Sequence, residues 1–175
     1  MTDLRYPIGT YVSPESSTHQ ERAAWIAEIA STPARVRAAV AGLSDSQLDT
    51  PYRDGGWTVR QVVHHMGDSH LVAFTRMKFA LTEENPVAKS YDEERWAELP
   101  DYISTPLEVS LTLLDAMHAR WAALMKGLSE EQFQRTFLHS SMGAVRLYQQ
   151  LAHYAWHCRH HVAHITALRD RNGWK

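Results

Sequence analysis

Residues 147–168 read LYQQLAHYAWHCRHHVAHITAL and contain five of the chain's 11 histidines, with neither proline nor glycine. The apolar residues in this segment recur at helical spacing: Leu147, Leu151, Tyr154, Cys158, Val162 and Ile165. This period predicts an amphipathic helix whose apolar side faces a protein core.

The positions of the histidines around this helix indicate which of them face inward. With Cys158 at the centre of the apolar stripe, His161 lies about 60° and His157 about 100° off centre, on the same side. The other three, His153, His160 and His164, lie further toward the back of the helix. His157 and His161 are one turn apart, and such a pair can offer two imidazole nitrogens to one metal ion. A third ligand must then come from another helix.

A histidine-rich helix can also be explained without a bound metal. The side chains can form a solvated face, a set of hydrogen-bonded core histidines or a pH-sensitive interface. The HxxxH pattern is short, so these alternatives stay open at this point.

Composition predicts one soluble domain spanning residues 1–175. The formal net charge is −2, which does not favour a nucleic-acid or membrane partner. A single cysteine excludes an intramolecular disulfide and fits a reducing compartment. The first residues lack the apolar core of a signal peptide, and no run of apolar residues is long enough to span a bilayer. We therefore expect a cytoplasmic protein.

The rest of the chain predicts three further helices and an extended N-terminal arm. The arm covers residues 1–17. The helices are expected at about 18–43, 59–81 and 107–126, joined by links at 42–57, 82–106 and 127–145. Pro33 lies inside the first helix, so this segment is either one kinked helix or two helices. The long 82–106 link is expected to form no more than one helical turn, around residues 93–99.

The predicted helix that begins at residue 59 also carries a histidine at the edge of its apolar stripe. Thr58 opens it with a TVRQ capping box that ends at Gln61. His65 lies about 100° from the centre of the apolar stripe, whereas His64 lies at the back. His70 falls within the stripe and is expected to be a hydrogen-bonded core residue.

Two similar short sequences suggest an internal repeat. GLSDSQL occupies residues 42–48 and GLSEEQF occupies residues 127–133, and each precedes a histidine-bearing helix. If the repeat is real, two similar helix–link–helix halves bring the helix of His65 beside that of His157 and His161.

Three neutral imidazoles around a divalent ion form an open site, because structural zinc normally has four protein ligands. Such an ion can activate a bound water or hold a thiol as thiolate. Imidazole suits zinc, nickel, copper or iron. Cys158 is interpreted as a core residue and Asp68 as a surface carboxylate.

Three motifs resemble the YfiT-type branch of the DinB superfamily: YPIG near the start, TPYRDGGWTVRQVVHHMGDSH in the middle, and YAWHCRHHVAHI with a terminal GW. The resemblance spans nearly the whole chain. It implies an all-α, antiparallel four-helix bundle, often a homodimer, that binds one divalent metal through three histidines, with zinc or nickel expected. At the family's ligand positions this chain has His65, His157 and His161.

The resemblance also implies the candidate functions. The first is a metal-dependent hydrolase acting on a small molecule, and the alternative is transfer of a low-molecular-weight thiol such as bacillithiol to electrophiles in detoxification. In either case the reacting group is a metal-bound water or thiol. A second alternative is a non-catalytic structural or sensor protein with four protein ligands. Arg53 and Arg60 can meet an acidic ligand but are interpreted as surface residues.

Overall fold

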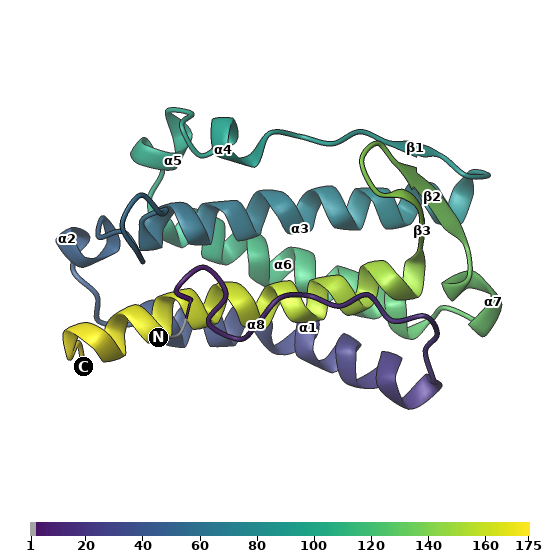
Figure 1. The fold of residues 1–175 in the computed structure, drawn as a ribbon, viewed down its shortest axis with the longest axis horizontal. Coiled ribbons are helices and arrows are strands. Elements are labelled where there is room, and N and C mark those ends of the chain that lie inside the picture. The colour runs from purple at the N-terminus through teal and green to yellow at the C-terminus, as the bar shows by residue number, and fades with distance from the viewer. Residues whose placement is uncertain (1–2) are drawn as a thin grey trace.

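Four long helices lie side by side in the structure, a computed structural model that describes residues 3–175 (Figure 1). They are α1 (His19–Val40), α3 (Val59–Thr82), α6 (Leu107–Lys126) and α8 (Leu147–Asn172). Helices α1 and α8 run in one direction, and α3 and α6 run in the opposite direction. The predicted antiparallel four-helix bundle is therefore confirmed.

The order of the helices around the bundle does not follow the chain. Helix α1 packs against α6 and α8, and α3 packs against the same two helices, so α1 and α3 are diagonal. Because α3 and α6 are parallel, the segment joining them has to return along the length of the bundle, and it does so on the outside of α3 (Figure 1). The long 82–106 link that the sequence predicted is this crossover.

Local sequence signals set the helix ends. The capping box predicted at Thr58 and Gln61 is present, and a second one opens α1 at Thr18. Helix α1 passes through Pro33 as one continuous helix. Helix α8 runs four residues beyond the predicted end, until Gly173 adopts a left-handed conformation with φ 63°.

The two related sequences form the same local structure. GLSDSQL contains helix α2 (Asp45–Leu48) and GLSEEQF contains helix α7 (Glu130–Phe133). Each short helix is opened by a serine whose capping box ends at a glutamine. The helices that follow them, α3 and α8, pack against each other, as the repeat predicted.

The connections contain structure that the sequence did not reveal. Strands β1 (Val87–Ala88), β2 (Thr136–His139) and β3 (Gly143–Arg146) form a small sheet in that order. Strand β1 is parallel to β2, and β2 is antiparallel to β3. Helix α4 (Glu93–Trp96) lies where the sequence predicted one helical turn, around residues 93–99, whereas helix α5 (Asp101–Ser104) was not predicted. A two-residue strand has no period, and its partner lies about fifty positions away, so no local pattern predicts the pairing.

The N-terminal arm is extended, as predicted, and the structure shows that it lies along α8 (Figure 1). The Tyr11 hydroxyl donates to the carbonyl of Gln149 at 3.1 Å, and the Tyr148 hydroxyl donates to the carbonyl of Glu15 at 2.6 Å. The arm therefore covers a face of α8 that would otherwise meet solvent. Among the described residues, none of the helices combines the length and apolar character needed to cross a bilayer.

Candidate metal centre

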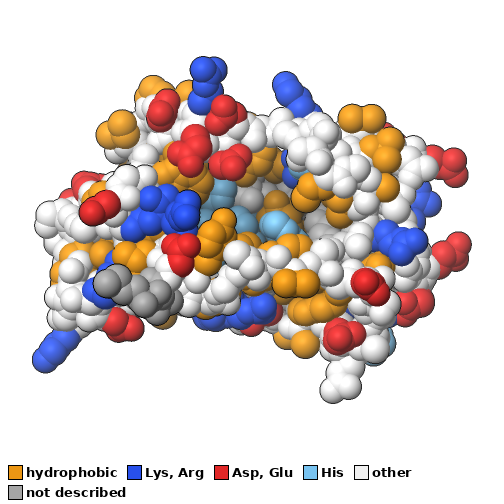
Figure 2. Space-filling model, in the orientation of Figure 1, with side chains coloured by type: hydrophobic (Ala, Val, Ile, Leu, Met, Phe, Trp, Pro, Cys, Tyr) orange, Lys and Arg blue, Asp and Glu red, His pale blue; other side chains and the backbone are white. Residues whose placement is uncertain are grey.

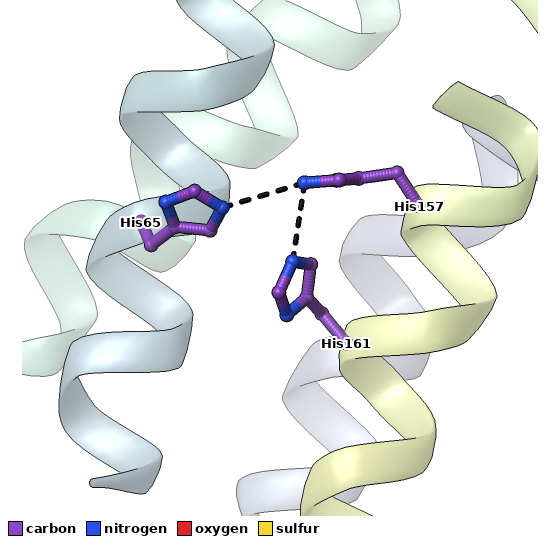
Figure 3. Close-up of side chains that lie close together, drawn as sticks. All are labelled: His65, His157 and His161. Carbon is purple, nitrogen blue, oxygen red and sulfur yellow. Dashed lines mark hydrogen bonds between the residues drawn. The ribbon is translucent and has the colours of Figure 1, made fainter. Parts of the chain in front are cut away.

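The three histidines predicted as metal ligands meet between α3 and α8 (Figure 3). The Nε2 atom of His157 lies 3.3 Å from that of His65 and 3.1 Å from that of His161. One ring nitrogen from each of the three lies within 4.8 Å of the other two. All three side chains are buried.

These separations fit a metal ion. Two nitrogens that are each about 2.0–2.1 Å from one tetrahedral zinc ion lie about 3.3–3.4 Å apart. The two nitrogen pairs measured here, at 3.1 and 3.3 Å, are close to that value. His157 and His161 are four residues apart on α8, so their rings project from one face, while the antiparallel α3 brings His65 opposite them.

The surroundings keep these imidazoles neutral, which is the state that binds a metal. Burial lowers the pKa of His65 to about 4, and nearby His164 adds to the effect. Burial also lowers the pKa of His157 and of His161 well below the usual histidine value, with further lowering from the other imidazoles. At neutral pH the site therefore presents nitrogen lone pairs rather than positive charge.

The donor set contains nitrogen alone. Within residues 3–175, no cysteine, aspartate or glutamate belongs to the group that His65 forms with His157 and His161. Cys158 is fully buried, as the sequence predicted, and burial raises the pKa of its thiol to about 12. The arrangement thus matches the three protein ligands of an open site rather than the four of a closed one.

A second histidine group overlaps the first. His160, His161 and His164 also have ring nitrogens within 4.8 Å of one another. His161 is common to both groups, and a neutral imidazole has only one lone pair to share. The ring of His164 also donates from Nε2 to the carbonyl of Arg5 at 3.0 Å. One group at a time can therefore hold an ion.

The helical wheel placed His160 and His164 toward the back of α8, but the structure buries both side chains. The arm covers this face, with the ring of Tyr6 5.9 Å from that of His160. Similarly, His64 was placed at the back of α3, yet it is buried, and its Nδ1 lies 2.7 Å from the hydroxyl of Ser110 on α6. A wheel drawn for one helix cannot show which other segments cover its far side.

Two other histidines complete the buried set. His70 is a fully buried, hydrogen-bonded residue, as predicted, and its Nε2 lies 3.0 Å from Nδ1 of His157. His118 of α6 was not singled out from the sequence, although it lies one residue after Met117 and three before Trp121, within the buried stripe. Asp68 is half-buried rather than fully exposed, and it accepts a hydrogen bond from the hydroxyl of Tyr102 at 2.7 Å.

A cavity of about 600 Å³ opens onto the three histidines. It appears in Figure 2 as a hollow with histidine side chains at its floor. The ring of Trp57 covers one side of the site, 4.5 Å from the ring of His65. A neighbouring cavity of about 420 Å³ shares the lining residues Arg76, His139 and His153 with the first. The two cavities therefore adjoin.

The arginine on the cavity wall is not one that the sequence suggested. Arg60 is paired with Asp49 and Asp45, and Arg53 packs over the ring of Tyr52, so neither lines the site. Arg76 of α3 lines both cavities instead, and its guanidinium donates to the carbonyl of Lys89 at 2.6 Å. Within the described residues it forms no ion pair with a carboxylate.

The chain is similar along nearly its whole length to bacterial proteins that are named for metal-dependent hydrolysis. A protein of Bacillus licheniformis named "Putative metal-dependent hydrolase" is 47% identical over 175 residues, covering 99% of both chains. A protein of the same name from Bacillus cereus is 50% identical over 174 residues, covering 99% of this chain and 100% of that protein.

Solved structures show the same fold. YfiT from Bacillus subtilis, described as a probable metal-dependent hydrolase with an unusual four-helix bundle topology, has a TM-score of 0.96 and 47% identity over 98% of this chain and 99% of its own. The four-helix bundle protein TT2238 has a TM-score of 0.59 at 20% identity, over 83% of this chain and 98% of its own, which supports the fold alone. The model of the DinB superfamily matches residues 22–165, and the chain belongs to that superfamily.

Proposed function

We propose that this protein is a metal-dependent enzyme that binds one divalent ion through the Nε2 atoms of His65, His157 and His161. The observation that carries the proposal is the convergence of these three buried nitrogens at the floor of a cavity. Imidazole ligands favour zinc or nickel as the ion. An ion with three neutral ligands and an open position supplies Lewis acidity to a bound water or thiol.

Hydrolysis of a small molecule is the first candidate reaction. The relatives at about half identity are named for metal-dependent hydrolysis. Hydrolysis needs a group that accepts a proton from water. Among the described residues that line the 600 Å³ cavity, Glu93 is the one carboxylate, and we propose it as the proton acceptor.

Transfer of a low-molecular-weight thiol is the second candidate, and Arg76 favours it. A small acidic thiol such as bacillithiol needs a cation near the metal to bind its carboxylates, and Arg76 lines the cavity without a carboxylate partner in the described chain. The adjoining 420 Å³ cavity has an apolar wall that includes Phe137, Met142 and Val145. Two adjoining cavities offer separate places for a thiol and an electrophile.

A structural or sensor role requires a different site. Structural zinc is normally held by four protein ligands. The group described here has three, and its cavity leaves room for an exogenous ligand. This ligand count is why we favour an enzyme over a structural metal protein.

Loss of one ligand tests the metal site. His157→Ala combined with His160→Ala should abolish stoichiometric metal binding, because each of the two histidine groups then keeps only two members, while the far-ultraviolet circular dichroism stays close to that of the wild type. His160→Ala alone is the matched control on the same helix and should retain one ion per chain. Full metal occupancy in the double variant would remove His157 from the site.

The reaction itself is tested with protein loaded with zinc or nickel. A panel of amides and esters measures hydrolysis, and low-molecular-weight thiols with an electrophile measure transfer. Turnover of an ester or amide without thiol supports the hydrolase, whereas thiol-dependent consumption of the electrophile without hydrolysis supports the transferase. No turnover in either panel, together with a tightly bound fourth protein ligand, would favour the structural role.

We also propose that the protein is a homodimer acting on small molecules, without nucleic-acid or membrane partners. Light scattering coupled to gel filtration measures the mass of the particle, and a monomer of 20.0 kDa would contradict the proposal.

A further inference from the structure

A row of buried hydrogen bonds crosses the bundle and ends at His157. The Nδ1 atom of His157 lies 3.0 Å from Nε2 of His70, and Nδ1 of His70 lies 2.8 Å from Nε2 of His118. The Nδ1 atom of His118 lies 2.7 Å from the carbonyl oxygen of Ile29. These four residues come from α8, α3, α6 and α1, one from each long helix. We name this row the imidazole relay.

The chemistry of imidazole fixes the direction of every bond in the relay. The carbonyl oxygen of Ile29 accepts only, so Nδ1 of His118 must carry the proton. A neutral imidazole has one N–H, which makes Nε2 of His118 an acceptor and requires Nδ1 of His70 to donate. The same step makes Nε2 of His70 accept from Nδ1 of His157. Each contact holds one proton, and all three rings share one tautomer.

Pro33 explains why a helix carbonyl can serve as the end of the relay. In an α-helix the carbonyl of residue 29 accepts from the N–H of residue 33. Proline has no N–H, so the continuous helix α1 leaves the Ile29 carbonyl without its usual donor. A buried carbonyl needs a partner, and His118 supplies it.

The relay determines which nitrogen of His157 faces the other two imidazoles. With its proton held on Nδ1, His157 directs the Nε2 lone pair toward Nε2 of His65 and of His161. Those two rings lack a comparable anchor, because their buried Nδ1 atoms have no hydrogen-bond partner in the described structure. His157 is therefore the ligand whose ring the protein itself orients.

We propose that the imidazole relay presets His157 as an Nε2 metal ligand before any ion binds, and that His70 and His118 are positioning residues for the metal centre. This inference rests on the proposed function, in which His157 is a ligand. A ligating histidine generally needs a partner for its other nitrogen to fix the tautomer and the ring orientation. Here that partner is a chain of two further imidazoles, and the backbone of α1 anchors it.

The tautomers of the metal-free wild-type protein give the first test. Nuclear magnetic resonance of ¹⁵N-labelled imidazoles distinguishes an Nδ1–H ring from an Nε2–H ring. At neutral pH, His118, His70 and His157 should all be Nδ1–H tautomers. An Nε2–H tautomer at His70 or His157 would overturn the relay, and this result does not depend on metal binding.

Two variants at His118 give the second test, with Zn²⁺ affinity measured by chelator competition. His118→Leu should weaken Zn²⁺ binding about 10- to 100-fold, the usual effect of losing an outer partner of a metal ligand. His118→Gln should stay within a few-fold of wild type, because its amide can donate to the Ile29 carbonyl and accept from His70. Wild-type affinity in His118→Leu, with the His157 tautomer unchanged, would overturn the proposal.

A matched control separates positioning from general loss of packing. His64 is also buried and also has a hydrogen-bond partner, the hydroxyl of Ser110 at 2.7 Å from its Nδ1, but it lies outside the relay and outside both histidine groups. His64→Leu should bind Zn²⁺ as wild type does. An equal loss of affinity in His64→Leu and His118→Leu would overturn the positioning role. If His118→Leu does not fold, the wild-type tautomers and the Zn²⁺ affinity of His118→Gln still test whether the relay positions His157.

The proposal for the relay and the proposal for the metal site can be rejected independently of each other. Full Zn²⁺ binding by the His157→Ala, His160→Ala double variant would reject the proposed ligand set, whatever the tautomers are. Loss of Zn²⁺ in that double variant but not in His160→Ala, together with an Nε2–H tautomer at His70 in the wild type, would keep the ligand set and reject the relay.

Discussion

The Nε2 atoms of His65 and His157 lie 3.3 Å apart, although 92 residues separate them in the chain. The contact joins α3 to α8, the two helices that follow the related short helices α2 and α7. Without an ion, the two neutral imidazoles share at most one hydrogen bond between these nitrogens, whereas a metal ion would bind both of them. The contact therefore makes specific predictions about metal binding.

The adjacent histidines His64 and His65 should differ sharply in their effect on metal content. Both variants are made in a His160→Ala background, which leaves the second histidine group with two members. His65→Ala should then lose stoichiometric zinc, because only two members of each group remain. His64→Ala should keep one ion per chain, since the ring of His64 lies against Ser110 of α6. Elemental analysis after gel filtration measures both. Equal metal content in the two variants would contradict the assignment of His65.

Removing the metal should lower the thermal stability without unfolding the bundle. At a free zinc concentration of 100 dissociation constants, binding adds about 2.7 kcal/mol to the free energy of unfolding. For a chain of this size, that corresponds to a melting temperature about 5–10 °C higher than in excess chelator. Calorimetry with zinc or with chelator measures the shift. An unchanged melting temperature would mean that the ion does not bind the folded state.

The stability of the metal-free protein should fall as the pH is lowered from about 6.5 to about 4. Burial lowers the pKa of His65 and of His164 to about 4, and that of His160 to about 3, from the usual 6.5. Between these values the unfolded chain takes up protons that the folded chain does not. The free energy of unfolding therefore decreases as the pH falls. The stabilisation is present above pH 6.5 and is lost as the pH falls through 4.

Each such histidine contributes a slope of up to about 1.4 kcal/mol per pH unit. Urea unfolding in chelator at pH 7, 6 and 5 measures the effect, with a constant slope against urea as the check for two-state unfolding. A urea midpoint that does not move over this range would show that these histidines are not kept neutral by the fold.

Arg76→Met should discriminate between acidic and neutral substrates. A charge-assisted hydrogen bond contributes about 1.5–3 kcal/mol, so the KM for acidic substrates should rise about 10-fold or more. Neutral substrates and the metal content should be little affected. Arg60→Met is the matched control on the same helix, because Arg60 is paired with Asp49 and Asp45 away from the cavity. Equal effects of the two variants would remove Arg76 from the substrate site.

Cys158 should not react in the folded protein. Its thiol is fully buried, and burial raises its pKa to about 12, so the reactive thiolate is scarce at neutral pH. A thiol reagent should modify it slowly in buffer and rapidly in urea. Cys158→Ala should retain any thiol-transfer activity, because the transferred thiol is an external one. Rapid labelling of the native protein would contradict this placement.

The sequence by itself determined the four long helices and the three candidate ligands. Helix spans follow from local period and local caps, such as the box between Thr58 and Gln61, which need no information from distant residues. The spacing of His157 and His161 placed both rings on one margin of α8. The resemblance to a known family then identified His65 as their partner on another helix.

Only the tertiary structure decided which groups surround these ligands. The arm buries His160 and His164, Arg76 rather than Arg53 lines the cavity, and β1 pairs with a strand about fifty residues later. The relay from Ile29 through His118 and His70 takes one residue from each long helix, and no local pattern in the sequence links them. Contacts of this kind depend on helix packing and on covering segments, which the period of a single helix does not encode.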